Sequence, residues 1–369
     1  ATEPSISDLR HYVQDPGSSA VRDETTMALE AKMPVRSYLL KIAAAGLIAA
    51  GGYAALRPGT KAEVERIDFG AVRTPTEPVY VAELKPASDA RIREYRIPIR
   101  HERIEIAPGV FYEGWTFGGT VPGPVMRVRQ GDLVRVTLVN EAPMAHSIDF
   151  HSARIPMNVA FKTIMPGEEL QFEFVARDPG AYMVHCGTPP VLMHIMQGMY
   201  LAFIVDPKDG WGTEADKEFV LVQSEFYAGP ERNGVHLGDW NAAMDKAATH
   251  VVFNGRAFQY KQHPLQVDVG DRVRIFVVNA GPSLRSDFHI VGAVFDRVYP
   301  DGNPKNVLNS VQTWTIPAGG GAVFETVFEE GASGEGVYAF VTHAFADAEK
   351  GAVGLIQVGQ PDLVASVGH

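Results

Sequence analysis

Short stretches in which apolar and polar side chains alternate recur along the chain from about residue 62 onward. The segments VRVTLV (134–139), LQFEFVA (170–176) and VRIFVV (273–278) show this pattern, and glycine, proline and asparagine stand between such stretches. A period of two is typical of a β-strand that buries one of its faces. The chain beyond residue 62 is therefore predicted to be all-β, with many turns.

One stretch of this β-rich part occurs twice. MRVRQGDLVRVTLVN (126–140) aligns without gaps with LQVDVGDRVRIFVVN (265–279). Further along, the Asp-Phe-His segment at 149–151 matches that at 287–289 at almost the same offset. Such a repeat favours two copies of one β-domain, and two tandem Greek-key β-sandwiches are the simplest arrangement.

A different pattern precedes these domains, because residues 38–56 read YLLKIAAAGLIAAGGYAAL with Lys41 as their one charge. Roughly 20 apolar residues span a bilayer as a helix, so we expect an N-terminal transmembrane helix over 37–57. With Lys32 and Arg36, Lys41 places positive charge on the N-terminal side, which puts the N-terminus in the cytoplasm and the body outside it. A cleaved signal peptide and a packed soluble helix are the alternatives.

Length and composition agree with this division. The 369 residues are enough for two or three domains, and 46% hydrophobic with 21% charged residues exclude a disordered chain and a polytopic membrane protein. The net charge of −11 argues against nucleic acid as a partner. The predicted parts are an N-terminal extension (1–36), the transmembrane helix (37–57), a linker (58–63), a first domain (64–210), a second domain (211–360) and a tail (361–369).

The single cysteine, Cys186, stands among potential metal ligands. One cysteine excludes an internal disulfide framework and a multi-cysteine zinc or iron–sulfur site. His194 and Met199 follow it in the same segment, and His146 lies on an earlier predicted strand. Two imidazoles, a thiolate and a weak thioether form the ligand set of a type 1 electron-transfer copper. The alternative is a buried structural cysteine among core methionines.

Strand geometry predicts a second group of ligands on the opposite face. His185 and Cys186 are adjacent and therefore point to opposite sides of a strand. His146 and His151 are five residues apart, so on a regular strand they also point to opposite sides. Cys186 and His146 are expected to face the interior, while His185 and His151 face outward together with Asp149. We therefore expect a second, imidazole-containing metal site there.

The second half of the repeat has no cysteine and cannot form a type 1 centre of its own. His289 stands at the position of His151, and His343 in VYAFVTHAF is the counterpart of His185. These two histidines are what the outer face of the second domain can contribute. The other histidines stand in no recognisable group and are interpreted as surface or packing residues: His11, His101, His236, His250, His263 and His369.

Together these motifs resemble those of the copper-containing nitrite reductases. The resemblance covers roughly residues 64–360 and rests on four segments: HSIDFH (146–151), HCGTPPVLMHIMQGM (185–199), SDFHIVG (286–292) and VTHAF (341–345). It implies a homotrimer of two-cupredoxin subunits that reduces nitrite to nitric oxide and water with one electron and two protons. It also implies two coppers per chain, type 1 in the first domain and type 2 between subunits.

Site residues carry over by motif. The implied type 1 copper ligands are His146, Cys186, His194 and Met199. The implied type 2 copper ligands are His151 and His185, with His343 supplied by the adjacent subunit. A site of this kind usually takes three protein ligands and leaves one position open, which agrees with a ligand from a neighbouring chain.

The resemblance also names residues around the substrate. Asp149 and His289 are the implied catalytic acid–base pair, and Thr313 in QTWTIP matches the hydroxyl that orients the catalytic histidine. Val291 stands where many relatives carry isoleucine over the substrate pocket. The implied electron donor is a periplasmic cupredoxin or cytochrome c. The body would then lie in the periplasm, anchored in the inner membrane through residues 38–56.

Two other functions fit parts of the pattern. A two-domain multicopper oxidase needs further His-X-His pairs and typically His-Cys-His, whereas Cys186 is followed by Gly187 and the second domain has no His-X-His. A membrane-tethered cupredoxin that only carries electrons would need neither Asp149 nor His289. Copper content combined with nitrite-dependent turnover distinguishes the three.

Overall fold

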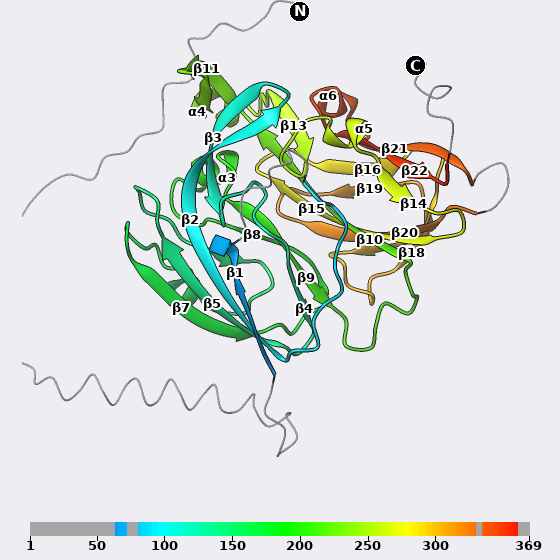
Figure 1. The fold of residues 1–369 in the computed structure, drawn as a ribbon, viewed down its shortest axis with the longest axis horizontal. Coiled ribbons are helices and arrows are strands. Elements are labelled where there is room, and N and C mark those ends of the chain that lie inside the picture. Colours follow the sequence, from blue (N-terminus) through cyan, green and yellow to red (C-terminus); the bar gives the residue numbers. More distant parts are fainter. Residues whose placement is uncertain (1–62, 72–79, 330–333, 361–369) are drawn as a thin grey trace, which may run out of the picture. The chain divides into compact units, whose positions relative to one another are not determined.

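The computed structural model describes residues 63–71, 80–329 and 334–360 (Figure 1). Strands dominate this part of the chain, which confirms the mostly β prediction. The helical elements are short: η3 (Phe69–Ala71), α2 (Met157–Ala160), α3 (Val191–Met196), α4 (Trp240–Met244), α5 (Gln259–Gln262) and α6 (Phe345–Ala348). In the ranges described, no helix has the length and apolar character needed to cross a membrane. The helix predicted over 37–57 lies outside these residues.

The first sandwich consists of two sheets around one core. Its larger sheet contains β1 (Val64–Asp68), β2 (Ile92–Ala107), β3 (Val110–Phe117), β5 (Leu133–Asn140), β7 (Glu169–Val175), β11 (Ala228–Arg232) and β12 (Val235–Gly238). The strand order is β11-β12-β3-β2-β5-β7, with β1 paired to β2. Its smaller sheet has the order β4-β9-β8-β6, formed by β4 (Met126–Arg129), β9 (Tyr200–Asp206), β8 (Gly180–His185) and β6 (Asp149–Phe150).

The second sandwich repeats this plan. One sheet runs in the order β13 (His250–Phe253), β10 (Lys217–Phe226), β15 (Arg272–Gly281), β20 (Gly321–Val327), β17 (Phe295–Pro300) and β18 (Leu308–Val311). The other runs in the order β14 (Leu265–Val267), β22 (Val353–Val358), β21 (Gly336–Thr342), β16 (Ser286–Ile290) and β19 (Thr313–Ile316). The parallel pair β2–β5 corresponds to β10–β15, and the antiparallel pair β8–β9 corresponds to β21–β22.

The repeated asparagine has the same role in both copies. The Asn140 side chain donates to the carbonyls of Met144 and Ile164 at 2.8 and 3.0 Å. Asn279 donates in the same way to the carbonyls of Leu284 and Ile316 at 2.9 and 3.0 Å. Each side chain therefore ties the loop that leads to the Asp-Phe-His segment to a later segment of the same sandwich, at Ile164 or Ile316. The sequence repeat is thus a structural repeat.

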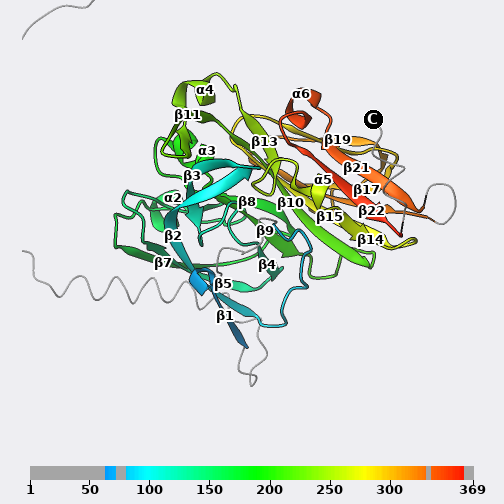
Figure 2. The same cartoon turned by 45° about the horizontal axis from the view of Figure 1, so that its top comes forward.

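The smaller sheet of the first sandwich is covered on both faces. Along β9, Leu201 and Phe203 pack into the core of the first sandwich, while Tyr200 and Ala202 pack with residues of β10 and β15. Figures 1 and 2 show β8 and β9 between the larger sheet and β10–β15. This burial explains why β9 is continuously apolar rather than alternating. It also places one face of β8 toward the second sandwich.

The hairpin β11–β12 follows β10 in the chain but extends the larger sheet of the first sandwich, where His236 pairs with Tyr112. The chain therefore returns to the first sandwich after residue 210. That boundary between the domains stays a prediction.

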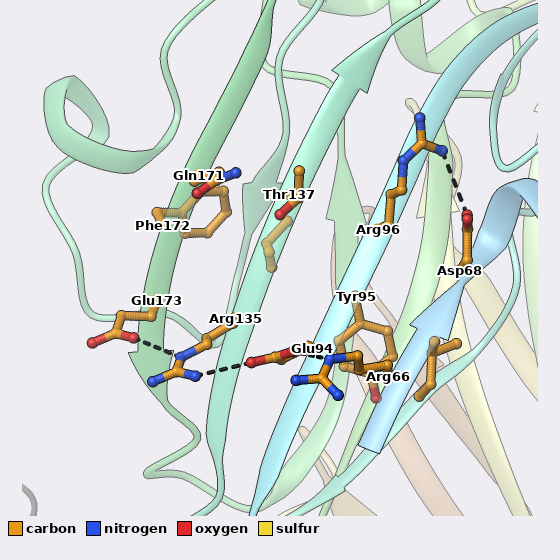
Figure 3. Close-up of a pocket in the computed structure, with 12 residues that line it drawn as sticks. Arg66, Asp68, Glu94, Tyr95, Arg96, Arg135, Thr137, Gln171, Phe172 and Glu173 are labelled. Carbon is orange, nitrogen blue, oxygen red and sulfur yellow. Dashed lines mark hydrogen bonds and ion pairs between the residues drawn. The ribbon is translucent and has the colours of Figure 1, made fainter. Parts of the chain in front are cut away.

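The outer face of the larger sheet carries a row of alternating charges across β1, β2, β5 and β7 (Figure 3). Arg66 pairs with Glu94 at 2.9 Å, Glu94 with Arg135 at 2.9 Å, and Arg135 with Glu173 at 3.0 Å. Neighbours in this row are also register partners in the sheet. The charges satisfy one another across strands and help to fix the register of the edge strand β1.

Candidate metal centres

The first group of ligand atoms lies inside the first sandwich. Cys186 follows the last residue of β8, His194 lies on α3, and His146 stands before β6. The Cys186 sulfur is 3.2 Å from His194 Nδ1 and 4.0 Å from His146 Nδ1, and the two Nδ1 atoms are 3.0 Å apart. All three residues are buried. The fold thus brings together two imidazole nitrogens and one sulfur from three separate segments.

Met199 belongs to the same core. It is fully buried, its backbone N–H donates to the carbonyl of His194, and its carbonyl accepts from the Cys186 N–H at 3.1 Å. The backbone N–H of Ser147 donates to the Cys186 sulfur at 3.3 Å. This backbone donor helps to hold the sulfur in place beside the two imidazoles.

Burial keeps both imidazoles of this group neutral. It is the main cause that lowers the pKa of His146 to about 3, and the neighbouring His194 lowers it further. Burial likewise lowers the pKa of His194 to about 4. Near neutral pH both rings therefore carry a free lone pair on one nitrogen, as a metal ligand must.

The second group lies on the other side of β8. His185 Nε2 is 3.0 Å from His151 Nε2 and 3.9 Å from a carboxylate oxygen of Asp149. Asp149 and His185 are register partners on β6 and β8. His151 is exposed and His185 is partly buried. Because His185 and Cys186 are consecutive, one peptide unit joins the two groups.

Two backbone carbonyls orient the rings of this second group. His151 Nδ1 donates to the carbonyl of Gly319 at 2.9 Å, and His185 Nδ1 donates to the carbonyl of Cys186 at 2.9 Å. Each ring then presents Nε2 as its free acceptor, and the two Nε2 atoms face each other. Gly319 belongs to the second sandwich, so the second sandwich orients a histidine of the first. Sequence reasoning missed this contact, because a backbone carbonyl carries no residue signature.

The second sandwich holds its histidines in a separate cluster. The ring centroids of His289 and His343 are 5.4 Å apart. His289 Nδ1 donates to the carbonyl of Gln312 at 2.6 Å, and the Thr313 hydroxyl lies 3.4 Å from the same nitrogen. Val291 follows β16 and is 49% exposed.

The structure therefore brings the predicted ligands together in part. Among the described residues, two groups of side chains have ligand atoms within 4.8 Å of one another: His146, Cys186 and His194, and Asp149, His151 and His185. His343 belongs to neither group. The buried group offers one soft sulfur and two neutral imidazoles, and this donor set fits copper. The exposed group offers two imidazoles and fits a metal with open positions.

The structure also gives His101 a place that its sequence context did not indicate. His101 lies on β2 opposite Trp115 on β3, and its Nε2 is 3.0 Å from His146 Nε2. It is therefore a packing residue that also contacts the buried group. The sequence gives no local signal for this contact, because the pairing of His101 with Trp115 depends on the register of β2 and β3.

The fold and the two groups define the class, a mostly β, cupredoxin-like protein equipped to bind metal. Residues 99–210 match the family model described as multicopper oxidase. A copper-containing nitrite reductase of Neisseria meningitidis serogroup B is 37% identical over 292 residues, 76% of this chain and 73% of that protein. One from Alcaligenes faecalis is 31% identical over 379 aligned positions, 92% of this chain and 98% of that protein.

A solved copper nitrite reductase from Nitrosomonas europaea has the same fold. It aligns with a TM-score of 0.66 at 39% identity, over 73% of this chain and 95% of that one. The chain belongs to the copper-containing nitrite reductase family and is an oxidoreductase. This membership favours the nitrite reductase interpretation over the multicopper oxidase and the electron carrier.

Proposed function

We propose that this chain reduces nitrite to nitric oxide and water, consuming one electron and two protons, with type 1 copper in the buried group and type 2 copper in the exposed group. The observation that carries the proposal is the direct covalent link between the groups, because His185 and Cys186 are consecutive residues at the end of β8 and belong to different groups. An electron carrier needs only the buried group. A reductase needs both groups and a connection between them.

Different residues of the chain hold each metal, connect the two groups and control access to them. Bound copper supplies one-electron transfer at the buried group and an open Lewis-acid position for nitrite at the exposed group. His146, Cys186, His194 and Met199 hold the first metal. The peptide between Cys186 and His185 connects the two groups through bonds. Burial of the first group keeps nitrite away from the thiolate, while exposure of His151 leaves the second group open to a small anion.

Proton delivery falls to Asp149 and His289. The Asp149 carboxylate lies 3.9 Å from His185 Nε2, so it is within reach of an oxygen of nitrite bound at this group. His289 has its Nδ1 occupied by the Gln312 carbonyl, with the Thr313 hydroxyl beside it, and this leaves Nε2 to hold or pass the second proton. Val291, beside His289 and half exposed, would shape the wall of the substrate site.

The exposed group is incomplete within one chain, and this supports a shared site. His151 and His185 supply two imidazoles, and Asp149, the third residue of the group, is assigned to proton delivery. A catalytic site of this kind usually has three protein ligands, so one more is needed from elsewhere. We infer that His343 of a neighbouring subunit is the third ligand and that His289 arrives with it. A heterologous contact of this type closes into a ring, and a homotrimer completes three equivalent sites.

The proposed location of the protein is the periplasmic side of the inner membrane. Residues 38–56 anchor the protein in the inner membrane, with the body in the periplasm, where a cupredoxin or a cytochrome c donates electrons. The charge pattern beside this segment supports the orientation.

The function is tested by a copper count combined with turnover. Copper-loaded protein should contain two coppers per chain and release nitric oxide when nitrite and a reductant are added. Four coppers with oxygen uptake would instead identify an oxidase. One copper without turnover would identify an electron carrier.

A further inference from the structure

His101 and Trp115 form a stacked pair beside the buried group. They are register partners on β2 and β3, and their rings lie 4.9 Å apart between centroids with an angle of 7° between planes. Trp115 is 7% exposed, and its backbone N–H donates to the carbonyl of Gln197 at 2.8 Å. Its position is therefore fixed by both the sheet and the end of the α3 segment.

The indole of Trp115 also contacts both imidazoles of the group. Its ring centroid is 5.6 Å from that of His146 and 5.0 Å from that of His194, with interplanar angles of 73° and 70°. Edge-to-face contacts of this kind restrict how far each imidazole can rotate. Trp115 thus links the orientation of His101 to that of the two histidine ligands.

The hydrogen bond between His101 and His146 has only one possible direction when the metal is bound. His146 Nδ1 points toward Cys186 and His194, so Nδ1 is its ligand atom and Nε2 must carry the proton. His146 Nε2 then donates to His101 Nε2 across 3.0 Å. His101 must accept through a nitrogen without a proton, which places its own proton on Nδ1.

We propose that His101 is a positioning residue of the buried metal centre, which accepts the Nε2–H of His146 and is held in place by stacking on Trp115. The inference rests on the proposed assignment of the type 1 ligands. A metal-bound histidine generally needs a partner for its second nitrogen, and the partner is most often a carboxylate, a carbonyl or water. Here an imidazole takes that role, and it acts as an acceptor in only one tautomer.

Three variants separate hydrogen bonding from stacking. His101→Phe keeps an aromatic ring against Trp115 and removes the acceptor, so the His146 N–H loses its partner in a buried place. His101→Gln restores an acceptor oxygen at a similar reach and removes the aromatic ring. His263→Phe is the matched control, because His263 is exposed and contacts neither group.

The test measures copper affinity on apoprotein. Copper is titrated in competition with a chromophoric chelator while the thiolate-to-copper absorption band is followed, and the reduction potential is recorded for each loaded variant. His101→Phe is expected to weaken copper binding by about 10- to 100-fold and to shift the band and the potential. His101→Gln should recover most of this loss, and His263→Phe should match the unaltered chain.

Several outcomes would overturn the inference. If His101→Phe has unaltered copper affinity, absorption band and reduction potential, the hydrogen bond does not position His146. The same conclusion follows if His101→Gln is as impaired as His101→Phe. The electron paramagnetic resonance signal of copper at the exposed group, recorded in the same samples, shows that each variant is folded. If the unaltered chain lacks the thiolate band, the assignment of the buried group itself is wrong, and this differs from a failure confined to His101.

Discussion

The two sandwiches share a frame and differ in the loops that the frame carries. Asn140 and Asn279 make equivalent hydrogen bonds, and His185 and His343 stand at equivalent strand ends beside Asp149 and Asp287. Ser286 pairs with Ile316 as His146 pairs with Ile164, so Ser286 stands at the position of His146. Ala344 follows His343 as Cys186 follows His185. The inward face has therefore lost its thiolate and imidazole, while the outward histidine is kept.

Loop length explains part of this difference. Residues 186–199 join β8 and β9 and include α3 with His194, whereas residues 343–352 join β21 and β22 and include α6. The shorter loop of the second sandwich contains no histidine after His343. The repeated frame thus sets the positions of the strand-end histidines, while the loop after each of these strands supplies or omits the further side chains of a buried group. In the second sandwich, only the outward-facing histidines remain as potential metal ligands.

The largest expected effect comes from removing the feature that is unique to the first sandwich. Cys186→Ala deletes the only thiolate, so the thiolate-to-copper band should vanish and turnover with a protein electron donor should fall to background. Copper at the exposed group and its binding of nitrite should survive, because His151 and His185 are unchanged. Visible spectroscopy and a nitric oxide electrode measure the two effects.

The matched control is Ala344→Ser at the equivalent position of the second sandwich, which should keep the band. A Cys186→Ala chain that retains the band or full turnover would contradict the difference between the sandwiches.

The next largest effect concerns the outward faces, where the two sandwiches are alike. Asp149→Asn removes the proposed proton donor while keeping the shape of the side chain. Turnover should fall by about 10²- to 10⁴-fold while both coppers stay bound. In the unaltered chain, turnover should decline above neutral pH because the reaction consumes two protons. Near-normal turnover of Asp149→Asn with nitrite would show that this carboxylate is only structural.

A smaller effect concerns stability and comes from the buried group of the first sandwich. Burial holds the pKa values of His146 and His194 at about 3 and about 4, below the 6.5 of an ordinary histidine. As pH falls below 6.5, the unfolded apoprotein takes up protons that the folded apoprotein does not. The free energy of unfolding should therefore decrease with falling pH, by at most about 1.4 kcal/mol per pH unit for each histidine.

Urea unfolding of apoprotein at several pH values between 7 and 4.5 measures this slope. His146→Gln should reduce it, because one titrating group is removed. An unchanged slope in that variant would contradict the assignment of the effect to the buried group.

The smallest effect tests the shared frame directly. Asn140→Ala and Asn279→Ala each remove two side-chain hydrogen bonds to backbone carbonyls, so each should lower the free energy of unfolding by about 1–3 kcal/mol. Equal losses measured by denaturant unfolding support two equivalent frames. A loss at only one position would show that the two asparagines do not contribute equally to stability, although their hydrogen bonds are equivalent.

Much of this fold could be predicted from sequence, because period-two alternation and the repeat are local signals. The opposite faces of His185 and Cys186 follow from adjacency on one strand, and the structure places them on opposite sides of β8. The return of the chain to the first sandwich through β11 and β12 could not be predicted, since pairing of an edge strand leaves no local pattern. The same holds for the burial of both faces of β9.

The surroundings of the candidate site were less predictable than its ligands. His101 contacts His146 because β2 and β3 are long enough to bring residues 101 and 115 together, and Gly319 contacts His151 because one sandwich packs against the other. Both contacts depend on tertiary geometry. The segment predicted to span a membrane, 38–56, lies outside the described residues and stays a prediction.

In the proposed trimer, the first sandwich of one chain and the second sandwich of a neighbouring chain build one substrate site. The direct measurement is complementation between an Asp149→Asn chain and a His343→Ala chain, each inactive alone, expressed together in one cell with different tags and purified through both. If sites are shared, each trimer that carries both tags has one site of three with an intact Asp149 and an intact His343, so activity returns to about a third of the unaltered level. If each chain builds its own site, every site carries a defect and the mixed protein stays inactive, which would contradict a site shared between neighbouring chains.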